Sequence, residues 1–388
     1  MKHAYKNNGL YIPYGRQWID EKDIQAVVDT LRSDWLTTGP KVSEFEQAVA
    51  DFVGAKKAVA VNSGTAALHA TMYAVGVGPG DEVILPPMTF VATANCIVFQ
   101  GGTPVFTDVN PDNLLIDPVQ IEEKITSKTK AIIAVDYAGH PCDYDALRHI
   151  ADKNGIFLIA DACHALGASY KGKMIGFLAD MTAFSFHPVK HITTGEGGMV
   201  VTDDAEFAEK MQRFRNHGIT RDVHQRRSQG TWSYEMVDLG YNYRITDSQC
   251  ALGKSQLDKL AGWIKRRREI ARQYDEALAK IPTIAPLHVK SDVYHAYHLY
   301  VCLINLTLLN TDRDAILKKL NAKGIGVNVH YIPVHLHPFY QNNFATKPGL
   351  CPVAEKAYEG LISLPIFPRM TDQEINAVIS SVEEVFNI

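Results

Sequence analysis

The chain has 388 residues, of which 46% are hydrophobic and 21% are charged, and its formal net charge is −4. This composition indicates a globular protein large enough for two domains, and it lacks the basic character that nucleic-acid binding requires. No apolar run approaches the roughly 18 residues of a membrane span, and the N-terminus has no apolar stretch of signal-peptide length. The six scattered cysteines include no C-x-x-C pair, which predicts neither disulfides nor a zinc site and suits a reducing cytoplasm.

Two amphipathic helices are predicted near the N-terminus. Residues 20–33 begin with a capping residue, Asp20, and place apolar side chains at the i, i+3, i+4 and i+7 positions of one helix face. The segment "DWLTTGP" is predicted to form a loop. Residues 41–54 then give a second amphipathic helix.

Between residues 58 and 203 the pattern changes to short apolar runs, several of them separated by helical patterns. Most runs are apolar throughout, which is typical of strands buried on both faces of a sheet. The runs cover residues 58–62, 82–87, 104–109, 131–137, 156–162, 181–186 and 198–203. This alternation predicts an α/β domain with a seven-stranded, mostly parallel sheet. No helix joins the last two runs, so one strand there is a candidate for antiparallel pairing.

A long helix is predicted after the sheet, at residues 256–281, as a connector to a second and smaller α/β unit. The elements expected in that unit are a strand at 298–304, a helix at 312–324, a strand at 326–333 and helices at 353–363 and 371–386. We place the division so that residues 1–262 form the N-terminal segment and large domain, and residues 263–388 form the small C-terminal domain.

Polar residues follow the carboxyl ends of several predicted strands, where open α/β sheets bind ligands. Ser63-Gly64-Thr65 opens a helix directly after the first strand. The free N–H groups of such a helix start, with a glycine that lets the backbone approach closely, form a seat for phosphate. An ordinary N-cap would give the same pattern, so this segment alone leaves both interpretations open.

Three further strand ends contribute an aromatic ring, an acid and a lysine. Phe90 follows the second strand, where it would either cover a flat ligand or pack in the core. Asp161 ends the fifth strand, and a carboxylate there needs a partner, either the N–H groups of the next turn or a cationic ring nitrogen. Ser185 and Lys190 follow the sixth strand. Taken alone, Lys190 is a surface lysine, a phosphate ligand or a nucleophile.

Taken together, these residues match the needs of pyridoxal 5'-phosphate. Its aldehyde bonds to a lysine, its ring nitrogen needs an anion, and its phosphate needs backbone donors. The sequence therefore predicts that Lys190 and Asp161 are catalytic, with the helix start and Phe90 holding the cofactor. No metal site is predicted, because the three histidines of "HYIPVHLHPFY" do not have the spacing of zinc ligands.

Several segments also resemble the DegT/DnrJ/EryC1/StrS sugar aminotransferases, which are fold-type I pyridoxal-phosphate enzymes. The resemblance runs nearly end to end and is carried by "IPYGRQWIDEKDI", "SDWLTTGPKVSEFE", "NSGTAALHA", "FSFHPVKHITTGEGG", "NHGITRD", "GYNYRITDSQCALG" and "LPIFPRMT". It implies a large domain with a seven-stranded sheet, a small C-terminal α/β domain, and a homodimer with shared active sites. Related sugar dehydratases have histidine in place of the cofactor-bound lysine. Lys190 holds that position here, which favours transamination.

The resemblance also implies roles for individual residues. Lys190 matches the lysine that forms the Schiff base, and Asp161 matches the partner of the pyridine nitrogen. Cofactor contacts are implied for Gly64, Thr65, Phe90, His164 and Ser185, and for Asn242, which would reach the phosphate of the neighbouring subunit. A nucleotide-sugar pocket is implied for Tyr14, Asp34, Trp35, Leu36, Thr37, Tyr331, Ile332 and Pro333. Many members have Gln at the position of His164 and Glu at that of Ala160, so this chain departs from the family there.

The activity that the resemblance implies is transfer of an amino group from L-glutamate to C4 of a UDP-linked 4-keto-6-deoxy-N-acetylhexose. One alternative is an aminotransferase that acts at C3 or C4 of another nucleotide-linked keto-sugar. A second, from a different class, is a regulatory protein that holds pyridoxal phosphate without turnover. No nucleic-acid or membrane partner is expected, and the expected location is the cytoplasm.

Overall fold

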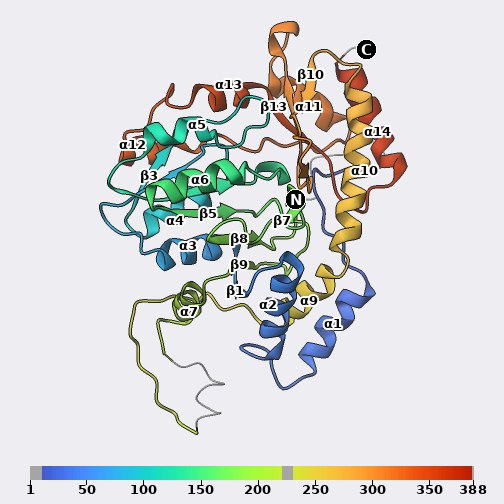
Figure 1. Cartoon of the computed structure of the whole chain (residues 1–388). Helices are drawn as coiled ribbons and strands as arrows, with labels where there is room; N and C mark the ends of the chain where they lie inside the picture. Colours follow the sequence, from blue (N-terminus) through green and yellow to red (C-terminus); the bar gives the residue numbers. More distant parts are fainter. Residues whose placement is uncertain (1–10, 221–229, 387–388) are drawn as a thin grey trace.

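The structure is a computed structural model that describes residues 11–220 and 230–386. At its centre lies a seven-stranded sheet with the strand order β1-β9-β8-β5-β4-β2-β3 (Figure 1). Its strands are β1 (Lys57–Val61), β2 (Glu82–Leu85), β3 (Thr103–Phe106), β4 (Thr129–Val135), β5 (Phe157–Asp161), β8 (Met181–Ser185) and β9 (Gly198–Thr202). Strand β9 is antiparallel to β1 and β8, and the remaining pairs are parallel. The seven predicted strands and the antiparallel strand at the end of the series are confirmed.

Helices cover both faces of this sheet, because its central strands are buried along nearly their whole length. The helices that precede or follow its strands are α1 (Glu21–Leu31), α2 (Pro40–Val53), α3 (Gly64–Ala74), α4 (Val91–Phe99), α5 (Pro118–Ile121), α6 (Tyr144–Asn154), α7 (Ala205–Phe214) and α9 (Asp247–Leu257). The predicted cap of the first helix is confirmed, since Asp20 and Asp23 form a reciprocal capping box.

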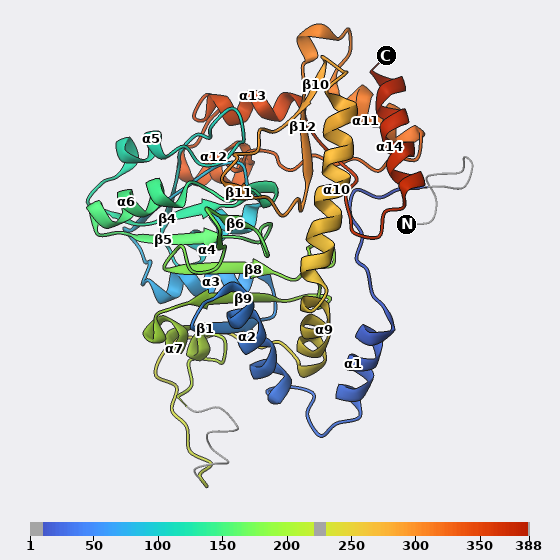
Figure 2. The ribbon, with the colours of Figure 1, turned by 45° about the vertical axis from the view of Figure 1, so that its right-hand side comes forward.

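The C-terminal part is built around a second sheet, which is antiparallel and has the order β10-β12-β13. Its strands are β10 (Ile284–Pro286), β12 (Tyr300–Ile304) and β13 (Leu361–Leu364). The helices of this part are α10 (Leu260–Leu278), α11 (Arg313–Ala322), α12 (Pro338–Phe344), α13 (Pro352–Gly360) and α14 (Asp372–Val385). Figure 2 shows α10 running along one side of the molecule, from α9 to a position beside α14.

Two boundaries and one strand predicted in this part are wrong. The long helix predicted at 256–281 begins at Leu260, because residues 256–257 end α9. The strand predicted at 326–333 does not form, since its backbone pairs with the sheet only at Asn328, opposite Ser363. Residues 361–363, predicted as the end of a helix, belong to β13 and complete the antiparallel sheet instead.

The described residues form two hydrophobic cores, one around the large sheet and one around the antiparallel sheet. Helix α10 contributes to both: Leu260 and Ile264 belong to the first core, and Ile270 and Tyr274 belong to the second. The N-terminal segment contributes Ile12 to the second core. A division at residue 262/263 therefore cuts through a helix that ties the two cores together, and the two-domain boundary stays a prediction.

Smaller elements complete the described chain. They are a three-stranded sheet of β6 (Ser169–Tyr170), β7 (Lys173–Met174) and β11 (Val293–Tyr294), and the short 3-10 helices η1 (Glu122–Lys124), η2 (Tyr137–Gly139), η3 (Leu306–Leu308) and η4 (Val334–Leu336). The described residues between α7 and α9, 215–220 and 230–246, include a stretch that extends away from the body (Figures 1 and 2). Across residues 11–220 and 230–386, no helix has both the length and the apolar character of a membrane span.

Candidate active site

A cavity of about 530 Å³ opens at the carboxyl ends of the central strands. Its walls come from the segments that follow β1, β2, β5 and β8, together with residues 328–331 from the C-terminal part. Nine of the predicted site residues line it: Tyr14, Gly64, Thr65, Phe90, Asp161, His164, Ser185, Lys190 and Tyr331. The structure thus brings together residues that are far apart in the sequence.

One end of the cavity is the N-terminus of α3. Ser63 caps this helix by accepting the N–H of Ala66 at 3.1 Å, so its hydroxyl serves the helix itself. The first N–H groups of a helix have no acceptor within the helix, and they carry its positive partial charge. Gly64 lies against the end of β8, where an added Cβ would approach the Cβ of Ser185 to 2.8 Å. This end is therefore a narrow, electropositive cradle suited to an anion.

The carboxylate of Asp161 lies in the wall of the cavity and is 6% exposed. It accepts the hydroxyl of Thr93 at 2.6 Å and the N–H of Cys163 at 3.2 Å. The hydroxyl of Thr89 lies 2.7 Å from that of Thr93, and because Thr93 donates to the carboxylate, Thr89 donates to Thr93. Among the described residues, Asp161 has no ion-pair partner, so this buried negative charge is available to a cationic ligand group.

Lys190 projects from the loop after β8, and its Nζ lies 3.5 Å from Nε2 of His298. Burial lowers the pKa of Lys190 from its ordinary value of 10.5, although the nearby Cys163 and Asp161 act in the opposite direction. A lysine whose pKa is lowered gives up its proton more readily and becomes a better nucleophile and base.

Neutral histidines surround this lysine. Burial lowers the pKa of His164, His191 and His298 well below 6.5, and it lowers that of His330 to about 3. The rings of His164 and His298 lie 4.4 Å apart, and those of His191 and His298 lie 5.5 Å apart. Because these rings remain uncharged at neutral pH, the charged side chains that line the cavity are Lys190 and Asp161, together with Glu196 at its exposed rim.

Other predicted site residues lie outside this cavity. Asp34, Leu36 and Thr37 are exposed at the start of α9, where Thr37 pairs with Thr246. Trp35 lies in the same loop. At the C-terminal wall, Ile332 is exposed and Pro333 is buried, and neither lines the cavity.

Asn242 is exposed and also lies outside the cavity of its own chain. Its backbone nevertheless lies close by, because its carbonyl accepts the side-chain amide of Asn62 at 3.3 Å, one residue before Ser63. Asn242 is four residues from Thr246, so the 34–37 loop and Asn242 gather on one surface.

Two side chains of the cavity that bond to Asp161 or Lys190 were missed in the sequence. Thr93 lies in the first turn of α4, and its only signal was a position three residues after Phe90. His298 precedes β12 in "HAYHLY", and nothing in the sequence connects it with Lys190, 108 residues earlier. Both are placed by the packing of distant segments.

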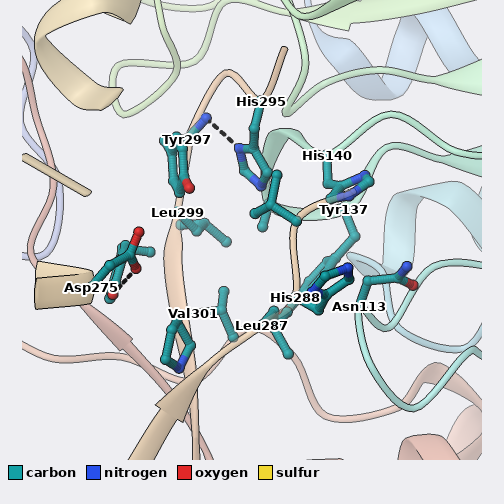
Figure 3. A pocket seen from close by; sticks show the side chains of 14 residues that line it. Asn113, Tyr137, His140, Asp275, Leu287, His288, His295, Tyr297, Leu299 and Val301 are labelled. Carbon is teal, nitrogen blue, oxygen red and sulfur yellow. Dashed lines mark hydrogen bonds between the residues drawn. The ribbon is translucent and has the colours of Figure 1, made fainter. Parts of the chain in front are cut away.

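A second cavity, of about 330 Å³, lies behind η2 and is lined from α10, β10 and β12 (Figure 3). Tyr137 and Ala138 line it from the η2 side. The hydroxyl of Tyr137 donates to the carbonyl of His330, and the N–H of Ala138 donates to His164. The short helix η2 is therefore the wall between this cavity and the candidate active site.

The main cavity fits pyridoxal phosphate, the cofactor that the sequence implies. Gly64 and the helix start offer backbone donors in a cradle too narrow for a side chain. Among the described residues, Asp161 is a buried anion without a cationic partner, and Lys190 is a half-buried amine without a carboxylate bonded to it. A phosphate, a protonated ring nitrogen and an aldehyde would satisfy these three groups in turn.

Known proteins resemble this chain in sequence and in fold. The spore coat polysaccharide biosynthesis protein SpsC of Bacillus subtilis is 44% identical over 97% of both chains. The structure of Helicobacter pylori PseC, an aminotransferase involved in the biosynthesis of pseudoaminic acid, matches with a TM-score of 0.91 and 35% identity over 97% of this chain and 99% of that chain. A putative sugar aminotransferase of Streptococcus pneumoniae, Spr1654, matches in its PLP form with a TM-score of 0.90 and 36% identity over 97% of this chain and 98% of that chain. Residues 17–383 match the family as a whole, and the chain therefore belongs to the DegT/DnrJ/EryC1/StrS aminotransferase family.

Proposed function

We propose that this protein is a pyridoxal-phosphate aminotransferase that moves an amino group from L-glutamate to C4 of a UDP-linked 4-keto-6-deoxy-N-acetylhexose. The product would be UDP-4-amino-4,6-dideoxy-N-acetyl-β-L-altrosamine, in the biosynthesis of pseudaminic acid. The observation that carries the proposal is the convergence of a buried anion, Asp161, a half-buried amine, Lys190, and a helix N-terminus in one cavity. The similarity to PseC supports the choice of sugar. The six free cysteines are consistent with a cytoplasmic location.

When bound, pyridoxal phosphate supplies an aldehyde that accepts the amino group and a ring that withdraws electrons. Asp161 would keep the ring nitrogen protonated, since its carboxylate is fixed by Thr93 and lies in a poorly hydrated wall. The Nζ of Lys190 would take the proton from the α-carbon of glutamate and, in the second half-reaction, deliver a proton to C4 of the sugar. The lowered pKa of Lys190 favours its action as the base.

The same proposal includes a homodimer whose two active sites are shared. The phosphate end of the cavity offers Gly64, Thr65 and Ser185, and its lining includes no cationic side chain except Lys190. Asn242 and the 34–37 loop lie together outside their own cavity, as residues that serve a partner's site would. The segment that extends after α7 carries exposed apolar side chains, with Trp232 at 87% and Leu239 at 68% exposure. A second copy of the chain would cover them.

The substrate is tested by offering L-glutamate with a panel of UDP-, dTDP- and GDP-linked keto-sugars, and by identifying each product by mass and NMR. The proposal expects turnover of the UDP-linked 4-keto-6-deoxy-N-acetylhexose, with amination at C4. Preferred turnover of another keto-sugar, or amination at C3, would favour the alternative of an aminotransferase that acts on another nucleotide-linked keto-sugar. Failure of the glutamate half-reaction itself would favour a non-catalytic role.

The shared site is tested by mixing two inactive variants, Lys190→Ala and Asn242→Asp, under conditions that let subunits exchange. A carboxylate at position 242 would repel the phosphate, so each variant should be inactive alone. In a mixed dimer, the site that uses the intact Lys190 borrows the intact Asn242 of the other chain, and about half of the sites in each mixed dimer recover. If an exchanged mixture stays inactive, Asn242 serves its own chain.

A further inference from the structure

The two ring nitrogens of His164 have partners of different kinds. The backbone N–H of Ala138 donates to Nδ1 at 3.3 Å, and Nε2 lies 3.2 Å from the hydroxyl oxygen of Tyr331. A backbone N–H can only donate, so Nδ1 must act as an acceptor and carries no proton. Burial lowers the pKa of His164 well below 6.5, which keeps the ring neutral. A neutral imidazole with a bare Nδ1 carries its proton on Nε2.

The proton on Nε2 fixes the direction of the next hydrogen bond. Nε2 donates this proton to the oxygen of Tyr331, so the hydroxyl of Tyr331 does not donate its own proton to His164. Burial raises the pKa of Tyr331 well above 10, and the phenol therefore keeps that proton at neutral pH. In the described part of the chain, His164 is the one hydrogen-bond partner of this hydroxyl. Tyr331 lines the active-site cavity, which leaves its O–H directed at whatever binds there.

We infer that Ala138, His164 and Tyr331 form a hydrogen-bond relay of fixed direction, which makes the Tyr331 hydroxyl a dedicated donor to an acceptor oxygen in the cavity. This inference rests on the proposed function for the nature of that oxygen, which is the keto oxygen of the sugar substrate or the ring oxygen of the cofactor. Both are acceptors, whereas a ligand group that can only donate would face the Tyr331 proton. The relay thus assigns Tyr331 a role in substrate discrimination and His164 a positioning role.

The origin of the fixed direction lies in η2, the wall between the two cavities. Ala138 has a left-handed backbone conformation, with a φ of 59°, and its N–H faces His164. Tyr137, its neighbour, is buried and its hydroxyl donates to the carbonyl of His330, one residue before Tyr331. The same short helix therefore holds both ends of the relay.

The proton position on His164 can be measured directly by ¹⁵N NMR of histidine-labelled, cofactor-free protein. Figure 3 shows two internal references in the second cavity. His295 accepts the N–H of Tyr297 on Nδ1 at 2.8 Å and has the same tautomer as His164. His140 has the opposite one, because its Nδ1 donates to the carbonyl of Pro141 at 2.7 Å and its Nε2 accepts the N–H of Lys290 at 3.1 Å.

The ¹⁵N signals of His164 are assigned as those lost in His164→Gln. We expect their chemical shifts to show a proton on Nε2, as in His295, and not on Nδ1, as in His140. A protonated Nδ1 on His164 would overturn the inference. This readout needs neither cofactor nor turnover, so it stands or falls independently of the proposed activity.

The donor role of Tyr331 is tested with substitutions that keep or reverse the direction of the relay. In His164→Gln, the amide oxygen can accept from Ala138 while the amide nitrogen donates to Tyr331, so discrimination should be kept. In His164→Glu, the carboxylate cannot donate, and the Tyr331 proton should turn away from the cavity. That variant and Tyr331→Phe should each weaken the binding of an acceptor ligand about three- to tenfold.

Two measurements locate the acceptor oxygen. A change in the Kd of pyridoxal phosphate in Tyr331→Phe would assign it to the cofactor, and a rise in KM for the keto-sugar with an unchanged cofactor Kd would assign it to the substrate. If neither constant changes while the parent protein transaminates, the relay has no function and the inference fails. If the parent transaminates no keto-sugar, the proposed function fails, while the cofactor arm and the NMR result still decide the relay.

Discussion

Replacing Gly64 with alanine should weaken cofactor binding through the backbone of the phosphate cradle. An added Cβ would lie 2.8 Å from the Cβ of Ser185, whereas ordinary contacts begin at 3.4 Å. The start of α3 must therefore move away from the end of β8 by about 0.6 Å, and binding of the phosphate must reverse that movement. Overpacking of this kind costs about 1–3 kcal/mol, so the Kd of pyridoxal phosphate should rise about 5- to 150-fold.

The assay is a titration of cofactor-free protein with pyridoxal phosphate, followed by absorbance, with thermal unfolding as a second readout. Gly262→Ala is the matched control, because Gly262 lies in α10 and an added Cβ there meets no heavy atom within 4 Å. The control should keep the parent Kd and gain up to about 1 kcal/mol of stability from helix propensity. An unchanged Kd in Gly64→Ala would refute the argument that this helix start forms the phosphate seat.

Three further predictions concern charges. Asp161→Asn keeps the shape of the side chain and removes its charge, so turnover should fall by about two to four powers of ten, and near-parental turnover would reduce Asp161 to a structural cap. Burial of Lys190 as a cation costs stability at neutral pH, and that cost is relieved as the pH rises from the lowered folded pKa toward the ordinary 10.5. Cofactor-free Lys190→Met should therefore unfold at a higher temperature than the parent at pH 7, and this difference in unfolding temperature should disappear by pH 10. A difference that does not depend on pH would contradict the charge of Lys190 as its cause. The guanidinium of Arg267 donates to the buried carbonyls of His298 and Ile366. Arg267→Met should therefore lower the free energy of unfolding, measured by urea denaturation, by about 2–4 kcal/mol. A smaller loss would show that water replaces the guanidinium as the donor to these carbonyls.

The large sheet was predictable because its strands are short and mostly apolar, and most of their residues are buried. The same property placed the polar strand ends correctly, since a charged residue directly after such a run has to lie at the edge of the sheet. Gly64, Asp161 and Lys190 could thus be grouped from the sequence, and the structure brings them into one cavity.

The C-terminal part was harder, because its pairing depends on segments far apart in the chain. Residues 326–333 alternate like a strand, yet β12 pairs with β10 and β13, and the segment bonds to this sheet through one backbone bridge and through the His330 imidazole on Ser363, at 2.9 Å. Hydrogen-bond partners such as Thr93 for Asp161 are set by the packing of distant segments, so local sequence patterns do not predict them. The tautomer of His164 depends in the same way on one backbone N–H, that of Ala138.

The most direct test of the account is to reduce the cofactor-loaded protein with borohydride and to locate the pyridoxyl group by peptide mass spectrometry. Lys190 lines the same cavity as Asp161 and has a lowered pKa, so the label should be found on the peptide that contains residue 190. Lys190→Ala should remain unlabelled there while still binding the cofactor through its phosphate and ring. A label on another lysine, or none in a yellow protein, would contradict the assignment of this cavity as the active site.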